Sequence, residues 1–305
     1  MTTLGFDTSN YTTSCAIYNS DTGQVNQHRK LLPVEKGERG LRQSEAVFAH
    51  LKQLPGLLDA LFETGRPPDA IGVSVRPRDV EGSYMPCFLV GETVARGIAA
   101  TGKIPIMKFS HQAGHLAAAL YGAGALELIT QPFLAFHASG GTTECLLVNP
   151  GKRHPFEVSI LGKTLDLAAG QVIDRVGVLL GTGFPAGPEL ERMAAQTKPL
   201  PFKPALKGAD CCLSGLENQC AGLLEEGKPP EQIAAFCQNA VGETLLAMAG
   251  QATKMHPGLP FVFAGGVMSN NFLRQRIEER VEGAKFAPAS LSADNAVGIA
   301  ILAAI

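Results

Sequence analysis

Short apolar runs separated by small polar turns are the first feature of the chain. Residues 2–6 and 14–18 form two apolar runs around the polar tip Asp7-Thr8-Ser9-Asn10, which predicts a hairpin. Residues 133–138 and 144–148 predict a second hairpin, with Ser139-Gly140-Gly141-Thr142-Thr143 at its tip. Two hairpins of one kind indicate a duplicated domain whose turns face a phosphate across a cleft, although plain polar turns are the simpler alternative.

Helices and strands alternate through the rest of the chain, which is typical of an α/β fold. Ser44 is the predicted N-cap of a helix that runs to about Glu63 and is kinked by Pro55. Gly102 is expected just past the end of a helix over residues 91–100. Further strands are predicted at residues 25–32, 70–75, 104–109, 156–161, 260–264 and 285–287. Further helices are predicted after residue 111 and at residues 167–180, 189–195, 230–255 and 294–305. An irregular connector is predicted at residues 198–207.

Length and composition limit the kind of protein. A chain of 305 residues is about twice the usual single-domain length, so we expect domains at residues 1–125 and 126–293, with residues 294–305 packing back on the first. The net charge of -2 gives no general basic field, so RNA binding would need a local patch or a partner protein. Seven cysteines without a C-x-x-C pair indicate a reducing compartment. Because neither a signal peptide nor a membrane-spanning apolar run is visible, we expect a cytoplasmic protein without a membrane.

Two histidines four residues apart, His111 and His115, carry the most specific chemical pattern. Strong helix formers follow them, and on a helix this spacing places both imidazoles on one face. Two such rings can supply half of a transition-metal site, with a carboxylate elsewhere as the missing ligand; a pair of ordinary core or surface histidines is the alternative. Gln112 stands where the zinc-protease motif H-E-x-x-H has its general base, and an amide cannot take up a proton.

A glycine pair late in the chain predicts a second kind of site. The strand expected at residues 260–264 ends at Gly265-Gly266, and a helix follows near Asn270. A strand, a glycine pair and a helix N-terminus in this order are typical of a nucleotide-binding corner. In the first hairpin, Asp7 is expected near a metal or an attacking group.

The whole layout resembles the actin, hexokinase and Hsp70 superfold, in which two tandem RNase H-like domains hold a nucleotide in the cleft between them. Within that superfold the sequence resembles the TsaD/Gcp family of tRNA threonylcarbamoyladenosine transferases, once described as O-sialoglycoprotein endopeptidases. The resemblance covers nearly the whole chain. It rests on the histidine pair, Ser139-Gly140-Gly141, LDLAAGQVID at 165–174, FPAGP at 184–188, LSGL at 213–216, GGVMSNNFLR at 265–274 and Asp294-Asn295.

The resemblance implies an activity and a set of ligands. The family transfers threonylcarbamoyl from its adenylate to the exocyclic amine of the adenosine beside the anticodon. It uses one transition metal ion, iron or zinc, an adenine nucleotide (ATP, AMP or the adenylate) and tRNA, with TsaB-like and TsaE-like partner proteins or a homodimer as possible assemblies. The implied residues are His111, His115 and Asp294 for the metal, Asp7 and Ser139 for catalysis, Ser139, Gly140 and Gly141 for the phosphate end, Asp174, Gly187 and Glu191 for the ribose and adenosine, and Asn270 for the nucleotide.

Three departures from the family pattern leave other functions open. The family has Cys-Asp-Glu-Thr where this chain has Asn10-Tyr11-Thr12-Thr13, so an acidic pair is missing. The family's Ser-Gly-Gly-His-Thr has Thr142 in place of histidine, and its Gly-Pro-Gly-Leu is replaced by Arg76-Pro77-Arg78-Asp79. A catalytically weakened paralogue with a regulatory or interaction role is therefore the first alternative to the transferase. A metalloendopeptidase is the second, and Gln112 argues against it.

Overall fold

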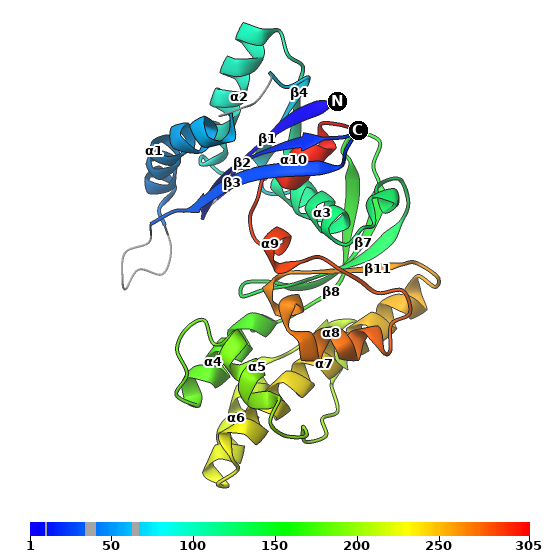
Figure 1. Cartoon of the computed structure of the whole chain (residues 1–305). Helices are drawn as coiled ribbons and strands as arrows, with labels where there is room; N and C mark the ends of the chain where they lie inside the picture. Colours follow the sequence, from blue (N-terminus) through cyan, green and yellow to red (C-terminus); the bar gives the residue numbers. More distant parts are fainter. Residues whose placement is uncertain (10, 34–40, 63–66) are drawn as a thin grey trace. The chain divides into compact units, whose positions relative to one another are not determined.

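The computed structural model describes residues 1–9, 11–33, 41–62 and 67–305 (Figure 1). The described chain divides into two compact units. Unit 1 consists of Met1–Ile129, Pro150–Glu157 and Ser290–Ile305, and unit 2 of Thr130–Asn149 and Val158–Ala289. The last residues of the chain therefore belong with the first ones.

Unit 1 is built on a five-stranded sheet in the order β3-β2-β1-β4-β5. β1, β2 and β3 form an antiparallel meander, and β4 and β5 run parallel to β1. Parallel strands need crossover connections, and helices provide them here. The elements are β1 (Thr2–Ser9), β2 (Thr12–Asn19), β3 (Gln24–Leu31), α1 (Gln43–Leu61), β4 (Ala70–Arg76), α2 (Phe88–Gly102), β5 (Ile106–Ser110), α3 (His111–Gly122), the 3-10 helix η1 (Leu126–Thr130), α9 (Ala289–Ser292) and α10 (Val297–Leu302).

The two faces of the first sheet are covered by different helices because successive strand residues point to opposite sides. Leu4 and Phe6 of β1 belong to the core that α1 and α2 bury on one face. Gly5 lies between them and faces α10, where an added Cβ would lie 2.5 Å from the backbone nitrogen of Ala300. The C-terminal helix therefore packs directly on the backbone of the sheet.

α10 also touches the backbone of α3. A Cβ added to Gly298 would lie 1.8 Å from the carbonyl oxygen of Gly114. Thr3 on β1 donates its hydroxyl to the carbonyl of Ala300 at 2.6 Å. Small residues at these crossings allow α3, α10 and β1 to approach more closely than larger side chains would permit.

Unit 2 repeats the strand pattern of unit 1. Its sheet has the order β12-β11-β6-β7-β8, with an antiparallel β6–β7 pair and with β11 and β12 parallel to β6. The duplication predicted from the two hairpins is therefore confirmed. The elements are β6 (Phe133–Ala138), β7 (Thr143–Pro150), β8 (Phe156–Lys163), α4 (Ala169–Leu179), α5 (Gly187–Ala194), β9 (Leu206–Lys207), β10 (Asp210–Cys211), α6 (Ser214–Glu225), α7 (Pro230–Met255), β11 (Phe261–Ala264), the 3-10 helix η2 (Gly266–Ser269), α8 (Asn271–Glu278) and β12 (Lys285–Phe286).

The core of unit 2 lies between its sheet and α7, most of whose residues are buried. Phe136, Phe263 and Phe286 stack across neighbouring strands, with ring centroids 5.2 Å and 5.1 Å apart for the two pairs. Such offset aromatic contacts add to the area that the rings bury. No helix in the described parts of the chain is long and apolar enough to cross a membrane.

Several predicted boundaries are wrong. α1 begins at Gln43, with Arg42 as N-cap residue in place of Ser44, and its expected end at Glu63 lies outside the described residues. Pro55 lies inside α1. α2 includes Gly102, because the left-handed residue that ends it is Lys103 (φ 53°). The last helix begins at Val297, not at Asp294, and the backbone N–H of Val297 donates a hydrogen bond to the side-chain oxygen of Asn295.

Candidate functional site

The histidine helix starts where the first sheet ends. Ser110 closes β5 and is the N-cap of α3, since its hydroxyl accepts a hydrogen bond from Ala113 N at 3.1 Å. His111 is therefore the first helical residue, and His115 follows one turn later on the same face. At the same edge of the sheet β1 supplies the fully buried Asp7, and β4 supplies Ser74, whose hydroxyl donates to that carboxylate.

Three predicted metal ligands come together in unit 1. The Nε2 atoms of His111 and His115 lie 2.9 Å apart, and they lie 3.5 Å and 3.2 Å from Oδ1 of Asp294. All three ligand atoms fall within 4.8 Å of one another. Asp294 reaches the helix because α10, which follows it, packs on α3. Within the described residues, this is the group of His, Cys, Asp and Glu side chains that could hold a metal ion.

These separations fit one transition metal ion. Bonds of about 2.0 to 2.1 Å at angles between about 90° and 110° would place the ligand atoms of one ion about 2.8 to 3.4 Å apart, so the 2.9 Å and 3.2 Å separations lie in this range and the 3.5 Å separation just above it. Nδ1 of His111 lies 3.0 Å from Oδ1 of Asp7, and because a carboxylate only accepts, that nitrogen carries the proton. Nε2 is then left for a metal, in the carboxylate–histidine arrangement common around metal sites.

The same contacts shift the ionisation of the site. Burial lowers the pKa of His111, but the charges and hydrogen bonds of Asp7 and Asp294 outweigh it and raise the pKa to about 10. Burial raises the pKa of Asp294, and the hydrogen bonds and charges of the two histidines outweigh it and hold the pKa far below its usual range. Because a metal needs the neutral imidazole, its binding here would release a proton and strengthen as the pH rises.

The second hairpin tip lies in unit 2, against the start of α4. The carbonyl of Ser139 accepts a hydrogen bond from Gly170 N at 3.1 Å, and the N–H of Ser139 donates to the carbonyl of Thr142 at 2.8 Å. The Ser139 hydroxyl accepts from Thr142 N at 3.2 Å. A Cβ added to Gly170 would lie 2.8 Å from Gly140 Cα, so only a glycine allows α4 to approach the turn so closely. Gly140 and Gly141 are themselves exposed, with open space where a Cβ would be.

The residues predicted for the ribose and nucleotide form one connected group in unit 2. Asp174 on α4 accepts from Ala186 N at 2.8 Å, directly before Gly187 at the start of α5. One turn later, Glu191 accepts from the backbone and side-chain nitrogens of Asn271 at 2.9 Å and 3.1 Å. The neighbouring Asn270 caps α8 through Leu273 N at 3.0 Å. The contacts thus link these predicted residues in one line along α4, α5 and α8.

The glycine corner after β11 touches the second hairpin. Gly265 has a left-handed backbone (φ 103°), and a Cβ there would lie 2.1 Å from the carbonyl oxygen of Ala138. Ala138 directly precedes Ser139, so the corner and the turn share one edge of the second sheet. Asp7, His111, His115 and Asp294 belong to unit 1, whereas every residue predicted for the nucleotide belongs to unit 2.

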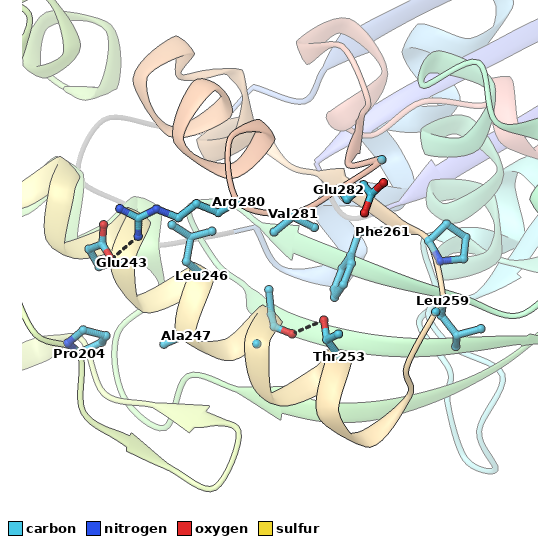
Figure 2. A pocket seen from close by; sticks show the side chains of 15 residues that line it. Pro204, Glu243, Leu246, Ala247, Thr253, Leu259, Phe261, Arg280, Val281 and Glu282 are labelled. Atoms are coloured by element: carbon cyan, nitrogen blue, oxygen red, sulfur yellow. Dashed lines mark hydrogen bonds and ion pairs between the residues drawn. The ribbon is translucent and has the colours of Figure 1, made fainter.

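A separate pocket of about 730 Å³ lies at the other end of β11 (Figure 2). Leu246 and Ala247 of α7, Phe261 and Val281 give it an apolar lining, and Arg280 is paired with Glu243 beside it at 2.8 Å. None of the residues predicted for the metal or the nucleotide lines this pocket.

Two carboxylates near the predicted residues were missed from the sequence. Asp166 accepts from Leu213 N at 2.7 Å and from the Ser214 hydroxyl at 2.5 Å, and so joins the loop before α4 to the start of α6. Asp79 accepts from the Ser110 hydroxyl at 2.6 Å. Both lie in segments that the sequence singles out, LDLAAGQVID and Arg76–Asp79, but their partners are distant in the chain.

Solved structures share the architecture of the chain. Component A of (R)-2-hydroxyglutaryl-CoA dehydratase from Acidaminococcus fermentans has a TM-score of 0.57 at 18% identity, over 99% of this chain and 97% of that one. A ROK family glucokinase from Streptomyces griseus has a TM-score of 0.54 at 11% identity, over 100% and 99%. The chain therefore has the actin, hexokinase and Hsp70 fold that the sequence predicted.

Sequence comparison narrows the fold class to one family. Residues 34–301 match the TsaD family, described as tRNA N6-adenosine threonylcarbamoyltransferase. A protein of that name from Thermus thermophilus is 34% identical over 308 residues, covering 99% of this chain and 92% of the relative. The one from Thermotoga neapolitana is 30% identical over 321 residues, covering 98% and 92%. The chain belongs to the TsaD family, which confirms the resemblance.

Proposed function

We propose that the chain transfers threonylcarbamoyl from threonylcarbamoyl-adenylate to the N6 amine of an anticodon-adjacent adenosine in tRNA. The observation that carries this is the convergence of His111, His115 and Asp294 in a member of the TsaD family. In the reaction the amine nitrogen bonds to the carbamoyl carbon, the bond from that carbon to the phosphate oxygen breaks, and AMP leaves with its electron pair. The amine gives up one proton.

His111, His115 and Asp294 would hold one transition metal ion, iron or zinc. Such an ion, when bound, would polarise the carbamoyl carbonyl or orient the adenylate. Asp7 is fully buried and bonded to Nδ1 of His111, so its contact with this ligand supports a role in orienting the ring. Ser74 holds the same carboxylate from β4.

The second unit would hold the adenylate. The exposed Gly140 and Gly141 suit the phosphate end, because a glycine lets an anion approach the backbone closely, whereas the first amides of α4 already donate to Thr143 and Ser139. Ser139 would contact the acyl phosphate from the same turn. Asp174 and Glu191 each bind backbone with one carboxylate oxygen, and we assign their other oxygens to the ribose hydroxyls.

The remaining contacts concern the base. The side-chain oxygen of Asn270 caps α8, so its amide hydrogens are the groups that we assign to the nucleotide. Gly187 lies at the first position of α5 with open space where a Cβ would be, which leaves room for the flat adenosine.

The family departures bear on the rate of this reaction. Thr12 and Thr13 are buried, and the Thr13 hydroxyl lies 2.8 Å from Nδ1 of His50, while Asn10 lies outside the described residues. Thr142 lies in the Ser139 turn without the histidine of the family pattern. We therefore expect slow transfer by the chain alone. The relatives' names favour the transferase over a weakened paralogue. Gln112 argues against an endopeptidase, because it stands where the zinc-protease motif has its general base.

Partner proteins would supply the attraction to tRNA phosphates that the charge of this chain does not provide. The net charge of -2 offers no general attraction to phosphates. Phe48 and Leu51 on α1 expose 60% and 54% of their surface, which suits a docking protein. A TsaB-like protein, with a TsaE-like ATPase, is the assembly that we propose, and a homodimer is the alternative.

The cellular setting follows from the thiols. All seven cysteines are free, and Cys212 is the exposed one. Free thiols in this number suit a reducing compartment, and we propose the cytoplasm.

The test is to incubate the purified chain with threonylcarbamoyl-adenylate and unmodified tRNA, with and without the partner proteins. Mass spectrometry of digested tRNA and release of AMP would report transfer. Modified adenosine is expected with the partners, and Asp294→Ala should abolish it while His256→Ala, outside the predicted site residues, retains it. No product in any combination, or full activity of Asp294→Ala, would contradict the proposal.

A further inference from the structure

The segment Arg76-Pro77-Arg78-Asp79 lies at the carboxyl end of β4 and contacts the start of the histidine helix. The family that this chain belongs to is expected to have Gly-Pro-Gly-Leu here, which offers no side-chain acceptor. The substitution therefore adds a carboxylate and two guanidinium groups beside a site whose geometry must be held closely.

Asp79 contacts α3 through the N-cap residue of that helix, Ser110. Its Oδ2 accepts the Ser110 hydroxyl at 2.6 Å, while the oxygen of that hydroxyl accepts from Ala113 N at 3.1 Å. The backbone of the segment adds a second contact, because the carbonyl of Pro77 accepts from Gln112 N at 3.0 Å. The segment thus holds the first turn of α3 on both sides of His111.

Asp79 is itself fixed in place. Its Oδ1 accepts from Nε and Nη2 of Arg76 at 2.9 Å and 2.7 Å, and the carboxylate is 14% exposed. Nη2 of Arg76 also lies 3.3 Å from Nδ1 of His154, and since a guanidinium only donates, this imidazole nitrogen accepts. The segment, Ser110 and His154 form one network within unit 1.

The network acts on the first residue of the helix. A hydrogen bond to a carboxylate is stronger than one between neutral groups, and a hydroxyl that donates to it becomes a better acceptor for the helix amide. The direction of the first helical turn sets where the His111 ring points, and with it the distances to His115 and Asp294. Loss of such outer contacts typically weakens metal binding.

We propose that Asp79 is a positioning residue for the metal-binding helix, acting through the Ser110 hydroxyl to hold the His111 ring in place. The inference rests on the proposed function, in which His111, His115 and Asp294 bind a metal ion. It assigns to Asp79 a role that the leucine of the family pattern at this position could not have.

The test measures binding of Co²⁺ alone to the full chain by titration and by the visible absorption of the bound ion. Asp79→Ala should weaken Co²⁺ binding about ten- to a hundredfold and change the absorption spectrum. Asp79→Asn keeps an oxygen for Ser110 and should recover most of the affinity. The matched control is Glu92→Ala, because Glu92 is similarly buried and binds Lys108 of β5 at 2.6 Å without touching α3.

A double variant separates positioning from general damage. If Asp79 acts through Ser110, then Asp79→Ala combined with Ser110→Ala should bind Co²⁺ about as well as Ser110→Ala alone. Wild-type affinity in Asp79→Ala, or full additivity of the two losses, would overturn the inference and leave the metal site intact. Failure of the wild-type chain to bind Co²⁺ would overturn the proposed metal site and the inference together.

Discussion

The two hairpins occupy corresponding places in two sheets of one strand order, yet their tips carry opposite kinds of chemistry. In unit 1 the charged side chain Asp7 is buried and bonded to Ser74 and His111. In unit 2 Gly140 and Gly141 at the tip are exposed and uncharged, and the Gly170 amide at the start of α4 donates to the carbonyl of the half-buried Ser139. The two copies thus share a backbone, while one tip carries a buried carboxylate and the other an uncharged glycine pair.

The difference also shows how each tip is held. The first depends on side chains from neighbouring strands, so a single replacement can leave a buried charge unpaired. The second depends on close approach of backbone, which glycines at 170 and 265 permit. Replacements should therefore act on metal binding in unit 1, and on stability and nucleotide binding in unit 2.

The largest effect is expected at the metal ligands. His115→Ala should weaken metal binding by more than about a hundredfold, because even the loss of an outer contact costs about ten- to a hundredfold. Elemental analysis of purified protein and a competitive chelator titration would measure this, with His256→Ala as the control. Equal metal content in both variants would show that the cluster at His111 is not the metal site.

Gly265→Ala should have the next largest effect. The left-handed backbone and the clash of a Cβ with Ala138 O should lower the free energy of unfolding by about 3 kcal/mol or more. Gly266→Ala is the matched control, since open space surrounds its Cβ position. Urea unfolding followed by circular dichroism would compare them. Equal stability of the two variants would mean that backbone approach does not hold the second tip.

A smaller loss is expected for the adenylate. Asp174→Ala should weaken nucleotide binding by about 1 to 3 kcal/mol, the cost of losing a hydrogen bond to a charged acceptor. Glu217→Ala is the control, because Glu217 pairs with the neighbouring Arg175 at 3.0 Å on the surface. Calorimetry with ATP and AMP in the presence of metal would test this. If the wild type binds neither, the nucleotide assignment is wrong.

The smallest effect concerns acid stability in unit 2. Burial raises the pKa of Asp166, but hydrogen bonds from Ser214, Leu213 and Leu167 outweigh it and lower the pKa to about 2. A depressed carboxyl pKa stabilises the fold above its ordinary value of 3.8, and this contribution disappears as the pH falls to about 2. The Tm of Asp166→Asn should thus lie slightly below that of the wild type at about pH 7 and converge with it at about pH 2. A constant difference would contradict this.

Much of the fold could be predicted because its signals are local. Apolar runs around polar tips predicted both hairpins, and the strong helix formers after His115 predicted the helix on which the four-residue spacing places His111 and His115 on one face. The boundary errors have local causes as well. Lys103 adopted the left-handed conformation expected of a glycine, and the helix Ser214–Glu225 was not predicted, because its few buried positions give a weak pattern.

The arrangement of the candidate site could be predicted only in part. His111 and His115 are four residues apart, but Asp7 and Asp79 reach the helix through strand pairing across the sheet. Such contacts leave no periodic pattern in the sequence. The resemblance to a family supplied Asp294, whereas the sequence marked the segment Arg76–Asp79 only as a departure from the family pattern and did not indicate the contact between Asp79 and Ser110. The assignments of Asp174, Gly187, Glu191 and Asn270 remain predictions, although the structure connects them.

The packing of α10 on α3 has a consequence for biosynthesis. His111 and His115 leave the ribosome long before Asp294, and Asp294 is held near them by a helix whose Gly298 touches the backbone at Gly114. A nascent chain that ends before Asp294 holds the two imidazoles without this carboxylate, and one that ends before Val297 lacks the helix that holds Asp294 in place. The complete group of three side chains can therefore form only after α10 has been synthesised and has packed on α3.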